Sequence, residues 1–337
     1  VFVTLIARAQ NLLNKPEHVV FDETNQCYLV TNYGNGKIIS IDTSGNQEVI
    51  IEGITGCLGI HIIDTTIFIS AGQNIHMYGL ISHAFIQTLP LIVTNWVDGM
   101  TDDGAGNLYA AENAGKVHKV DLSTYTDTII VNGGLPANPQ DLAYDPDGNR
   151  LLLVCWGTNS PIVSIDLSTY TVTDLVQTTS GQYDGIVRDE NGNLYVTSWM
   201  NSGRVYKWEP PYTSDPSIVS QGHAGPAGLA VNESGKILAV PNFNANSISY
   251  LSLIPTGIAD EKENPEIYMT DKMISIHSLE PFNLSVHDMA GRTIFRKLFP
   301  YGETRVSVDQ ILKNDAPGMF VVTVTTRSLM KSVKIIR

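Results

Sequence analysis

Three carboxylates and one carboxamide occupy matching places along the chain, and together they have the chemistry of a cation site. Glu17, Asp98, Gln140 and Asp184 each form the second residue of a short sequence that opens a recurring unit. Oxygen-only ligands of this kind suit Ca²⁺, which takes about six to eight oxygen atoms, waters included. Without a cation, carboxylates that meet at one point raise one another's pKa values. We therefore expect these four residues to be metal ligands if the fold brings them together.

A simpler interpretation of the same residues stays open. Asp98 and Asp184 each precede a glycine at the start of an expected strand. Asp-Gly is a common turn sequence, because the aspartate binds nearby backbone N–H groups and the glycine tolerates positive φ. On this interpretation the residues shape turns and hold no metal.

The recurring unit is what would position the four side chains. It consists of a short apolar strand, an Asp/Gly/Asn turn, a second strand that ends in Thr, Ser or Asn, and two further strands. Six units begin 40 to 44 residues apart, which is the length of a four-stranded propeller blade. Their first residues are Pro16, Cys57, Val97, Pro139, Tyr183 and Pro226. In a propeller the starts of the innermost strands lie around the axis, so distant residues meet there.

The sixth unit reaches Pro255 without a fourth strand, whereas residues 3–9 (VTLIARA) match the missing strand in type and length. We expect this N-terminal strand to close the ring and to leave no open blade. The chain contains no long stretch with the 3.6-residue period of a helix. The sequence thus predicts an all-β fold whose residues 1–255 form a closed six-bladed β-propeller.

The composition changes after the propeller. Residues 256–270 are charged and contain a proline, and we expect them to form a linker. Residues 271–337 contain alternating apolar segments such as FNLSVHD and MFVVTVTT. Such alternation predicts a small immunoglobulin-like β-sandwich.

Aromatic and amide side chains gather at the same predicted end of the propeller as the candidate metal ligands. Flat rings beside amides suit sugars, lactones and other amphipathic ligands. The candidate ligand-binding residues are His18, Tyr33, Trp96, Glu112, Trp156, Trp199, Asn242 and Phe243. Packing between neighbouring blades is an equal alternative for Trp156 and Trp199. For Glu112 the alternatives are a base, an outer metal ligand and a solvated surface charge.

Charge and hydropathy exclude several classes of partner. The first 255 residues carry 24 acidic and 10 basic side chains, and the remaining residues carry 10 acidic and 11 basic side chains. An acidic propeller is unsuited to nucleic acid, because phosphate binding needs a basic face. The chain contains no run of about 18 apolar residues, which a membrane-spanning helix would need. Cys27, Cys57 and Cys155 lie far apart and are expected to be buried strand cysteines.

The openings E-H-V-V-F-D at Glu17 and D-G-I-V-R-D at Asp184, with the G-N-L-Y sequences, carry a resemblance over residues 1–255. They resemble NHL-repeat propellers and, more specifically, the gluconolactonase/senescence-marker family of six-bladed propellers. The resemblance implies an axial calcium ion and a role for Asp184 as base or nucleophile. Gln140 replaces the Asn of the family pattern, Val97 replaces a second Asn, and Asn242 stands near the place of a catalytic His.

A second resemblance covers the tail. Its marks are Asn264-Pro265, LSVHDMAGR with Gly291, PGMFVVTV with Gly318, and a basic end with Lys331 and Lys334. In this order they resemble the C-terminal sorting domain of the bacterial type IX secretion system. The resemblance implies export from a Bacteroidota-type cell by that machinery, after removal of a signal peptide. An ordinary immunoglobulin-like module is the alternative.

These features predict a secreted or cell-surface propeller that binds a small molecule or glycan at one end, around an axial divalent cation. One alternative is a calcium-dependent hydrolase of the lactonase or esterase type, with Asp184 as its catalytic residue. Another is a non-catalytic structural or protein-interaction propeller. The fold does not choose among them, because propellers host all three.

Overall fold

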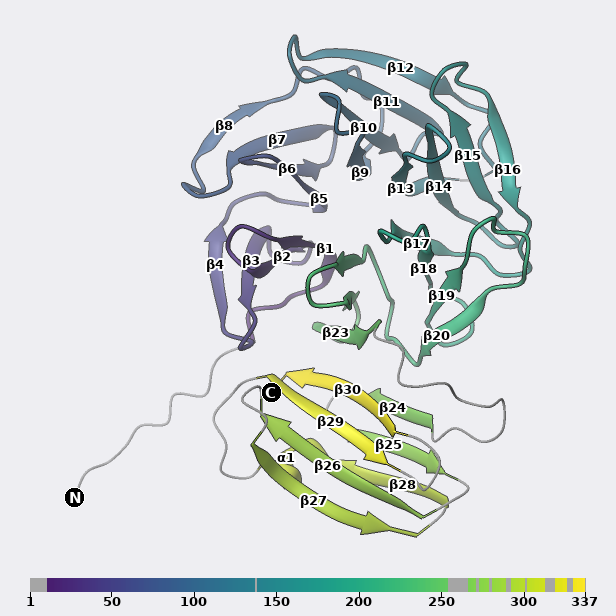
Figure 1. The fold of residues 1–337 in the computed structure, drawn as a ribbon. Helices are drawn as coiled ribbons and strands as arrows, with labels where there is room; N and C mark the ends of the chain where they lie inside the picture. Colours follow the sequence, from purple (N-terminus) through teal and green to yellow (C-terminus); the bar gives the residue numbers. More distant parts are fainter. Residues whose placement is uncertain are drawn as a thin grey trace, which may run out of the picture.

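The computed structural model describes residues 11–136, 138–253, 266–270, 273–278, 281–288, 292–300, 302–312, 319–325 and 330–336. The fold in these ranges is all-β, with one short helix, α1 (Val308–Ile311). Four-stranded antiparallel sheets follow one another around a central axis, as in a propeller (Figure 1). No helix in the described ranges is both long and apolar enough to cross a membrane.

Five four-stranded sheets run in chain order, each with its first strand innermost. Sheet 1 contains β1 (Pro16–Asp22), β2 (Cys27–Asn32), β3 (Lys37–Asp42) and β4 (Gln47–Ile51). Sheet 2 contains β5 (Cys57–Ile63), β6 (Thr66–Ala71), β7 (Asn74–Gly79) and β8 (Phe85–Thr88). Sheet 3 contains β9 (Val97–Asp102), β10 (Asn107–Glu112), β11 (Lys116–Asp121) and β12 (Thr126–Asn132). Sheet 4 contains β13 (Asn138–Asp145), β14 (Arg150–Trp156), β15 (Ile162–Asp166) and β16 (Val172–Val176). Sheet 5 contains β17 (Tyr183–Arg188), β18 (Leu194–Ser198), β19 (Arg204–Trp208) and β20 (Ser217–Gln221).

Sheet 6 starts with three strands, β21 (Ala230–Asn232), β22 (Ile237–Asn242) and β23 (Ser247–Ser252). β21 contacts both β17 and β1, so the last sheet lies between the fifth and the first. Backbone hydrogen bonds join it to sheet 1, from the Val19 N–H to the Gly228 carbonyl (3.1 Å) and from the Gly228 N–H to the Glu17 carbonyl (2.8 Å). The predicted closing strand, residues 3–9, lies outside the described residues.

Neighbouring sheets pack face to face through alternating apolar residues. Between sheets 6 and 1, the buried rings of Tyr28 and Tyr250 lie with their centroids 4.9 Å apart, and Val30, Ile39 and Ala239 join the same cluster. Alternation of this kind buries one face of each strand against the next sheet. The core is therefore divided among the gaps between sheets, and the axis is left to polar residues.

Hydroxyl groups connect innermost strands that do not pair as a ladder. The Thr31 hydroxyl accepts a hydrogen bond from the His18 N–H (2.9 Å) and donates one to the Leu58 carbonyl in the next sheet (2.6 Å). The same bridge recurs at Ser70, between Gly59 and Asp98, and at Thr197, between Gly185 and Ala227. These bridges satisfy backbone groups that would otherwise be buried without partners.

The tail forms two sheets. One contains β24 (Glu266–Thr270), β25 (Met273–Ser278) and β28 (Gly302–Ser307). The other contains β26 (Phe282–Asp288), β27 (Thr293–Phe299), β29 (Met319–Thr325) and β30 (Met330–Ile336). Buried residues of both sheets and of α1, such as Ile274, Leu284, Val322 and Ile311, share one core.

Two details of the tail differ from the sequence predictions. β24 begins at Glu266, inside the span 256–270 for which a linker is predicted. β30 pairs with β23 at Lys334 and Tyr250, so the tail strand extends sheet 6 (Figure 1). The sequence marks Asn264, Pro265, Gly291 and Gly318 lie outside the described residues.

Candidate functional site

The candidate ligands sit at irregularities in the innermost strands. The register of β1 against β2 shifts between Pro16 and Val19, and the register of β17 against β18 shifts between Tyr183 and Ile186. Comparable shifts occur at the starts of β5, β9 and β13. A β-bulge re-aims the side chains beside it. This local geometry turns residues of five sheets toward the axis.

Glu17, Asp98 and Asp184 come together at the axis, as their spacing predicts. Their exposed fractions are 6%, 7% and 7%. Burial, followed by the charges of Asp98, Asp184 and Asp141, raises the pKa of Glu17 well above its ordinary value. Burial and neighbouring carboxylates likewise raise the pKa of Asp98. Carboxylates that raise one another's proton affinity in this way are close neighbours in a space poor in water.

Glu17 and Asp184 lie close enough for each carboxyl group to affect the pKa of the other. Burial raises the pKa of Asp184 to about 7, against the opposing effect of the Trp199 indole N–H. Oε2 of Glu17 is buried and has no hydrogen-bond partner among the described residues. The site therefore contains an unpaired acceptor beside two further carboxyl groups.

A fourth carboxylate, Asp141, lies at the axis and follows the candidate ligand Gln140 in the chain. Asp141 is 3% exposed and accepts hydrogen bonds from the N–H groups of Leu142 (2.9 Å) and Ile186 (3.0 Å). The Gln140 amide instead donates to the Pro139 carbonyl (3.1 Å). Asp141 thus bridges sheets 4 and 5 as the hydroxyl groups bridge other sheets, because its neighbour on β14, Val154, has no hydroxyl.

His18 lies across the axis from sheet 4. Its Nε2 is 3.5 Å from Oδ2 of Asp141. Both side chains occupy a position that is glycine in the other four units, and an added Cβ at Gly99 or Gly228 would overlap Asp141 or His18. The glycines therefore make room for this pair, which fills the axis next to the three carboxylates.

The described residues contain no group of three or more His, Cys, Asp or Glu side chains arranged to hold a metal ion. The donor atoms of Glu17, Asp98 and Asp184 are nevertheless all oxygens, which is the chemistry that Ca²⁺ requires. Side-chain rotation of Glu17, Asp98 and Asp184 would be needed to coordinate an ion.

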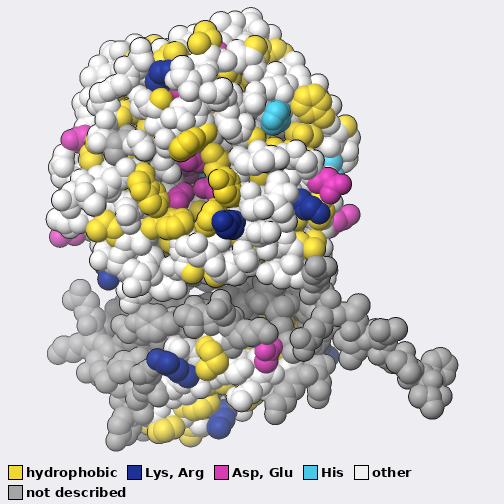
Figure 2. Space-filling model, turned by 180° about the vertical axis from the view of Figure 1, so that it is seen from behind, with side chains coloured by type: hydrophobic (Ala, Val, Ile, Leu, Met, Phe, Trp, Pro, Cys, Tyr) yellow, Lys and Arg dark blue, Asp and Glu magenta, His cyan; other side chains and the backbone are white. Residues whose placement is uncertain are grey.

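Four predicted rim residues form a continuous arc of aromatic rings. Ring centroids lie 5.8 Å apart for Tyr33 and Phe243, 5.8 Å for Phe243 and Trp199, and 5.4 Å for Trp199 and Trp156. The four rings come from consecutive sheets, 1, 6, 5 and 4, and each follows or ends a second strand. Asp and Glu side chains lie at the centre of this face, with hydrophobic side chains around them (Figure 2). We call the four rings the aromatic arc.

The remaining rim residues are less uniform. Trp96 is 47% exposed. Asn242 is buried, and its amide is bonded to His223 Nδ1 (2.9 Å) and to the Ser249 hydroxyl (2.9 Å). Burial lowers the pKa of His223, which favours its neutral form in this network. Asn242 thus supports the loop before Phe243 rather than facing the axis.

The interpretation of Glu112 as a solvated charge is wrong, because its side chain is 0% exposed. Its carboxylate accepts hydrogen bonds from the Thr94 N–H (2.8 Å), the Asn95 N–H (2.7 Å) and His118 Nε2 (2.9 Å). Burial would raise its pKa, but these bonds hold it at about 2. His118 is also bonded to Asp127 (3.0 Å), and its pKa is raised by the two carboxylates. This network fixes the loop that carries Trp96.

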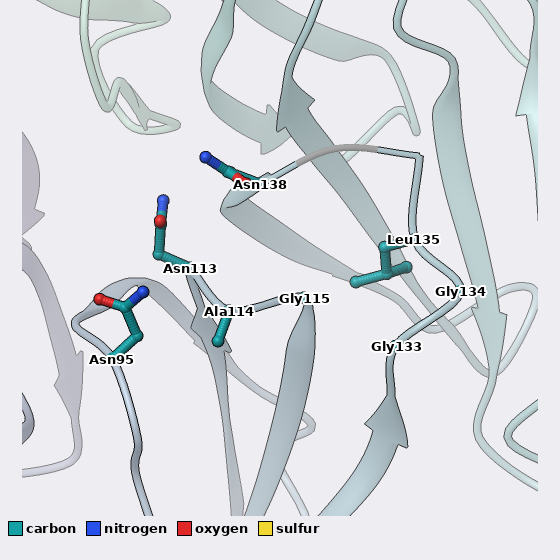
Figure 3. A pocket seen from close by; sticks show the side chains of 8 residues that line it. All are labelled: Asn95, Asn113, Ala114, Gly115, Gly133, Gly134, Leu135 and Asn138. Atoms are coloured by element: carbon teal, nitrogen blue, oxygen red, sulfur yellow. The ribbon is translucent and has the colours of Figure 1, made fainter.

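A hollow lies beside this loop. Its volume is about 510 Å³, and Figure 3 shows the side chains of Asn95, Asn113 and Asn138 along one side and Leu135 on another. None of its lining residues is charged. The hollow is separate from the carboxylates, and Asn113 stands where the aromatic arc has its rings in other sheets.

Sequence reasoning missed Asp141 and the His118 network. The signal for Asp141 was present, because it aligns with Gly99 and Gly185 of the D-G openings and with His18. A charged residue in a glycine position indicates a side chain that points into the axis. The His118 network depends on the fold of the Thr94 loop and has no comparable sequence signal.

No protein-family model matches the chain, and no curated protein matches it. Solved structures do. A gluconolactonase from Xanthomonas campestris has a TM-score of 0.61 at 11% identity, over 75% of this chain and 93% of its own. A luciferin-regenerating enzyme has a TM-score of 0.58 at 16% identity, over 70% of this chain and 87% of its own.

A third structure extends over the tail. PorZ, a surface component of the type-IX secretion system of Porphyromonas gingivalis, has a TM-score of 0.50 at 11% identity. The match covers 100% of this chain and 60% of PorZ. At such identities a structural likeness establishes the fold alone. By its fold, the chain is a β-propeller-like protein.

Proposed function

We propose that this chain is a secreted or cell-surface protein whose propeller binds a small molecule or glycan at the axial face, where carboxylates hold a divalent cation. One observation carries the proposal: Glu17, Asp98 and Asp184 from three sheets are buried together, and Oε2 of Glu17 has no partner among the described residues. A cation at this point would offset the repulsion that raises their pKa values. Ca²⁺ suits the all-oxygen donor set.

The proposal includes the finer features of the architecture. Residues 1–255 form a six-bladed, NHL-like propeller of the gluconolactonase/senescence-marker type, and the contacts of β21 with β17 and β1 support a closed ring. The tail that begins at β24 and continues through residues 271–337 forms a type IX sorting domain that interacts with the secretion machinery of a Bacteroidota-type cell. Deletion of residues 271–337 in such a host tests the latter, because undiminished export of the propeller would contradict it.

Titration with Ca²⁺ alone tests the cation site. We expect saturable binding by calorimetry and a release of protons into weakly buffered solution, because Glu17, Asp98 and Asp184 hold protons that the ion displaces. Asp184→Asn should weaken the binding about tenfold or more, whereas the exposed Asp215→Asn should not. Absence of binding at millimolar Ca²⁺ would contradict the cation site.

A calcium-dependent lactonase or esterase is the second candidate. The pKa of Asp184, raised to about 7, lies where a carboxylate is an effective general base at neutral pH. Ca²⁺, when bound, would supply polarisation of a carbonyl or phosphoryl oxygen. Two enzymes among the similar structures, a gluconolactonase and a luciferin-regenerating enzyme, support testing lactone hydrolysis. Turnover by the wild type that is lost in Asp184→Asn would favour this candidate over simple binding.

A further inference from the structure

The carboxylates at the axis do not by themselves distinguish a metal ion from an organic cation. Both carry positive charge, and both would offset the repulsion among Glu17, Asp98 and Asp184. The distinction comes from what surrounds the carboxylates. A hydrated metal ion gains little from aromatic walls, whereas an alkylammonium group is attracted to the ring faces and its apolar body packs against them.

The aromatic arc supplies such walls on one side of the site. Its members are mutually packed at centroid distances of 5.4 to 5.8 Å, so the rings support one another. Nε1 of Trp199 is buried and has no hydrogen-bond partner among the described residues, and the indole lies near enough to Asp184 to affect its carboxyl group. Hydrophobic side chains surround the Asp and Glu side chains on this face (Figure 2). Gly225 makes room for the Trp199 ring, because a Cβ there would lie 3.0 Å from its Cη2.

The arc already contacts one ammonium group of the chain. Lys15 Nζ lies 5.5 Å from the centroid of the Phe243 ring, within the range of a cation–π interaction. Phe243 lies within the arc, between Tyr33 and Trp199, and Lys15 is exposed. The contact shows that the Phe243 ring presents its face to a cation at this surface.

The hydrogen-bonding groups at the site favour an ammonium group that has protons to donate. The exposed fraction of Glu17 is only 6%, and its Oε2 has no hydrogen-bond donor among the described residues. Asp98 and Asp184 offer further acceptors beside it. A primary ammonium has three donors and matches such a set, whereas a quaternary ammonium has none.

We propose that the axial face binds a primary alkylammonium ligand, whose charged head lies on Glu17, Asp98 and Asp184 and whose apolar body lies against Trp199 and Phe243. The inference rests on the proposed function, since it uses the same face and carboxylates. It adds the class of ligand and one consequence: Ca²⁺ and the amine exclude each other, because they need the same oxygens.

Cyclohexylammonium and its neutral counterpart cyclohexanol provide a matched pair of probes. Binding to the full chain is followed by tryptophan fluorescence and by ligand-observed NMR, in metal-free buffer. We expect saturable binding of cyclohexylammonium with a Kd of about 1 mM, at least about tenfold tighter than cyclohexanol. Equal affinities for the two probes would overturn the inference, because the carboxylates would then contribute nothing.

Two substitutions separate the head from the body. Asp184→Asn should weaken the binding of cyclohexylammonium about tenfold and leave the binding of cyclohexanol unchanged. Trp199→Leu should weaken the binding of cyclohexylammonium about fivefold. Asp215→Asn, an exposed carboxylate away from the axis, is the matched control and should change neither. Thermal unfolding verifies that each variant is folded, and Trp156→Leu is the second arc variant if Trp199→Leu does not fold. Unchanged affinity in folded variants of both kinds would overturn the inference.

Calcium distinguishes this inference from the proposed function. Ca²⁺ should raise the apparent Kd of cyclohexylammonium and leave that of cyclohexanol unchanged. Trp199→Leu should retain Ca²⁺ binding, because no ring is a calcium ligand. Ca²⁺ binding without amine binding would overturn the inference and leave the cation site standing. Amine binding without Ca²⁺ binding would support the inference and remove the metal from the proposed function.

Discussion

Replacement of Asp184 by asparagine should make the protein more stable in alkaline solution, by an amount that depends on pH. The pKa of Asp184 rises in the fold from its ordinary value of 3.8 to about 7, first because of burial and then because of Asp141. A carboxyl group that binds its proton more tightly in the folded state stabilises the fold at low pH. That contribution is complete below the unfolded pKa and is lost as the pH rises through the folded pKa.

The size of the effect follows from the two pKa values. Each tenfold change in proton affinity corresponds to about 1.4 kcal/mol, so a rise from 3.8 to about 7 corresponds to about 4 kcal/mol in total. Between about pH 5 and pH 8, this effect should lower the free energy of unfolding of the wild type by about 3 kcal/mol. Asparagine does not ionise, so the variant should lack this loss. Glu17 and Asp98, whose pKa values are also raised, act in the same direction, and their contribution is smaller in the variant because the Asp184 charge is one cause of both shifts.

Urea denaturation at several pH values, in metal-free buffer, measures this difference. The free energy of unfolding of Asp184→Asn minus that of the wild type should grow by about 3 kcal/mol from about pH 5 to pH 8. Asp215→Asn, at an exposed position, should give a flat difference. A flat difference for Asp184→Asn would refute the reasoning, because it would mean that Asp184 ionises in the fold as easily as in the unfolded chain. A saturating cation should reduce the wild-type slope.

Two further substitutions test the parts of the fold that position the site. Thr197→Val removes the hydroxyl that joins the Gly185 N–H to the Ala227 carbonyl, and it should lower the free energy of unfolding by about 2 to 3 kcal/mol in urea denaturation. The same change at the exposed Thr24 should lower it by less than about 0.5 kcal/mol. Equal effects at the two positions would contradict the hydroxyl bridge. Glu112→Gln leaves Lys116 without its buried carboxylate and His118 with Asp127 alone, and it should lower the free energy of unfolding by about 3 kcal/mol at neutral pH. This difference should shrink as the pH falls toward about 2, where Glu112 itself takes up a proton, and a pH-independent difference would argue against ionised Glu112.

The repeat made much of this architecture predictable from sequence. The 40- to 44-residue spacing predicts the starts of β1, β5, β9, β13 and β17 to within one residue, whereas β21 begins four residues after the sixth opening at Pro226. The bulges fall at the residues that the openings share. Glu17, Asp98 and Asp184 meet because equivalent positions in a circular array meet, whatever the side chain. Gln140 occupies the equivalent position of its unit, and Asp141 beside it occupies the position of His18 and bonds across to Ile186.

Features that depend on side-chain packing across units were out of reach of the sequence. The place of Glu112 is determined by the loop at Thr94, which brings backbone N–H groups to a carboxylate that the repeat pattern puts at the rim. The contact of β30 with β23 depends on how the tail lies against sheet 6, and no local propensity encodes it. Local patterns therefore predict the positions of the strands. They do not predict which hydrogen-bond partners the polar groups at the strand ends find.

The pairing of β30 with β23 has a consequence for how the protein behaves in solution. In the described structure the tail occupies part of the outer edge of the last sheet. A chain shortened to end at residue 253 would present the backbone donors and acceptors of Ser247–Ser252 to any passing strand. Loss of the tail would then promote dimers or larger assemblies, in which the chains pair along the open edge of β23 around Tyr250.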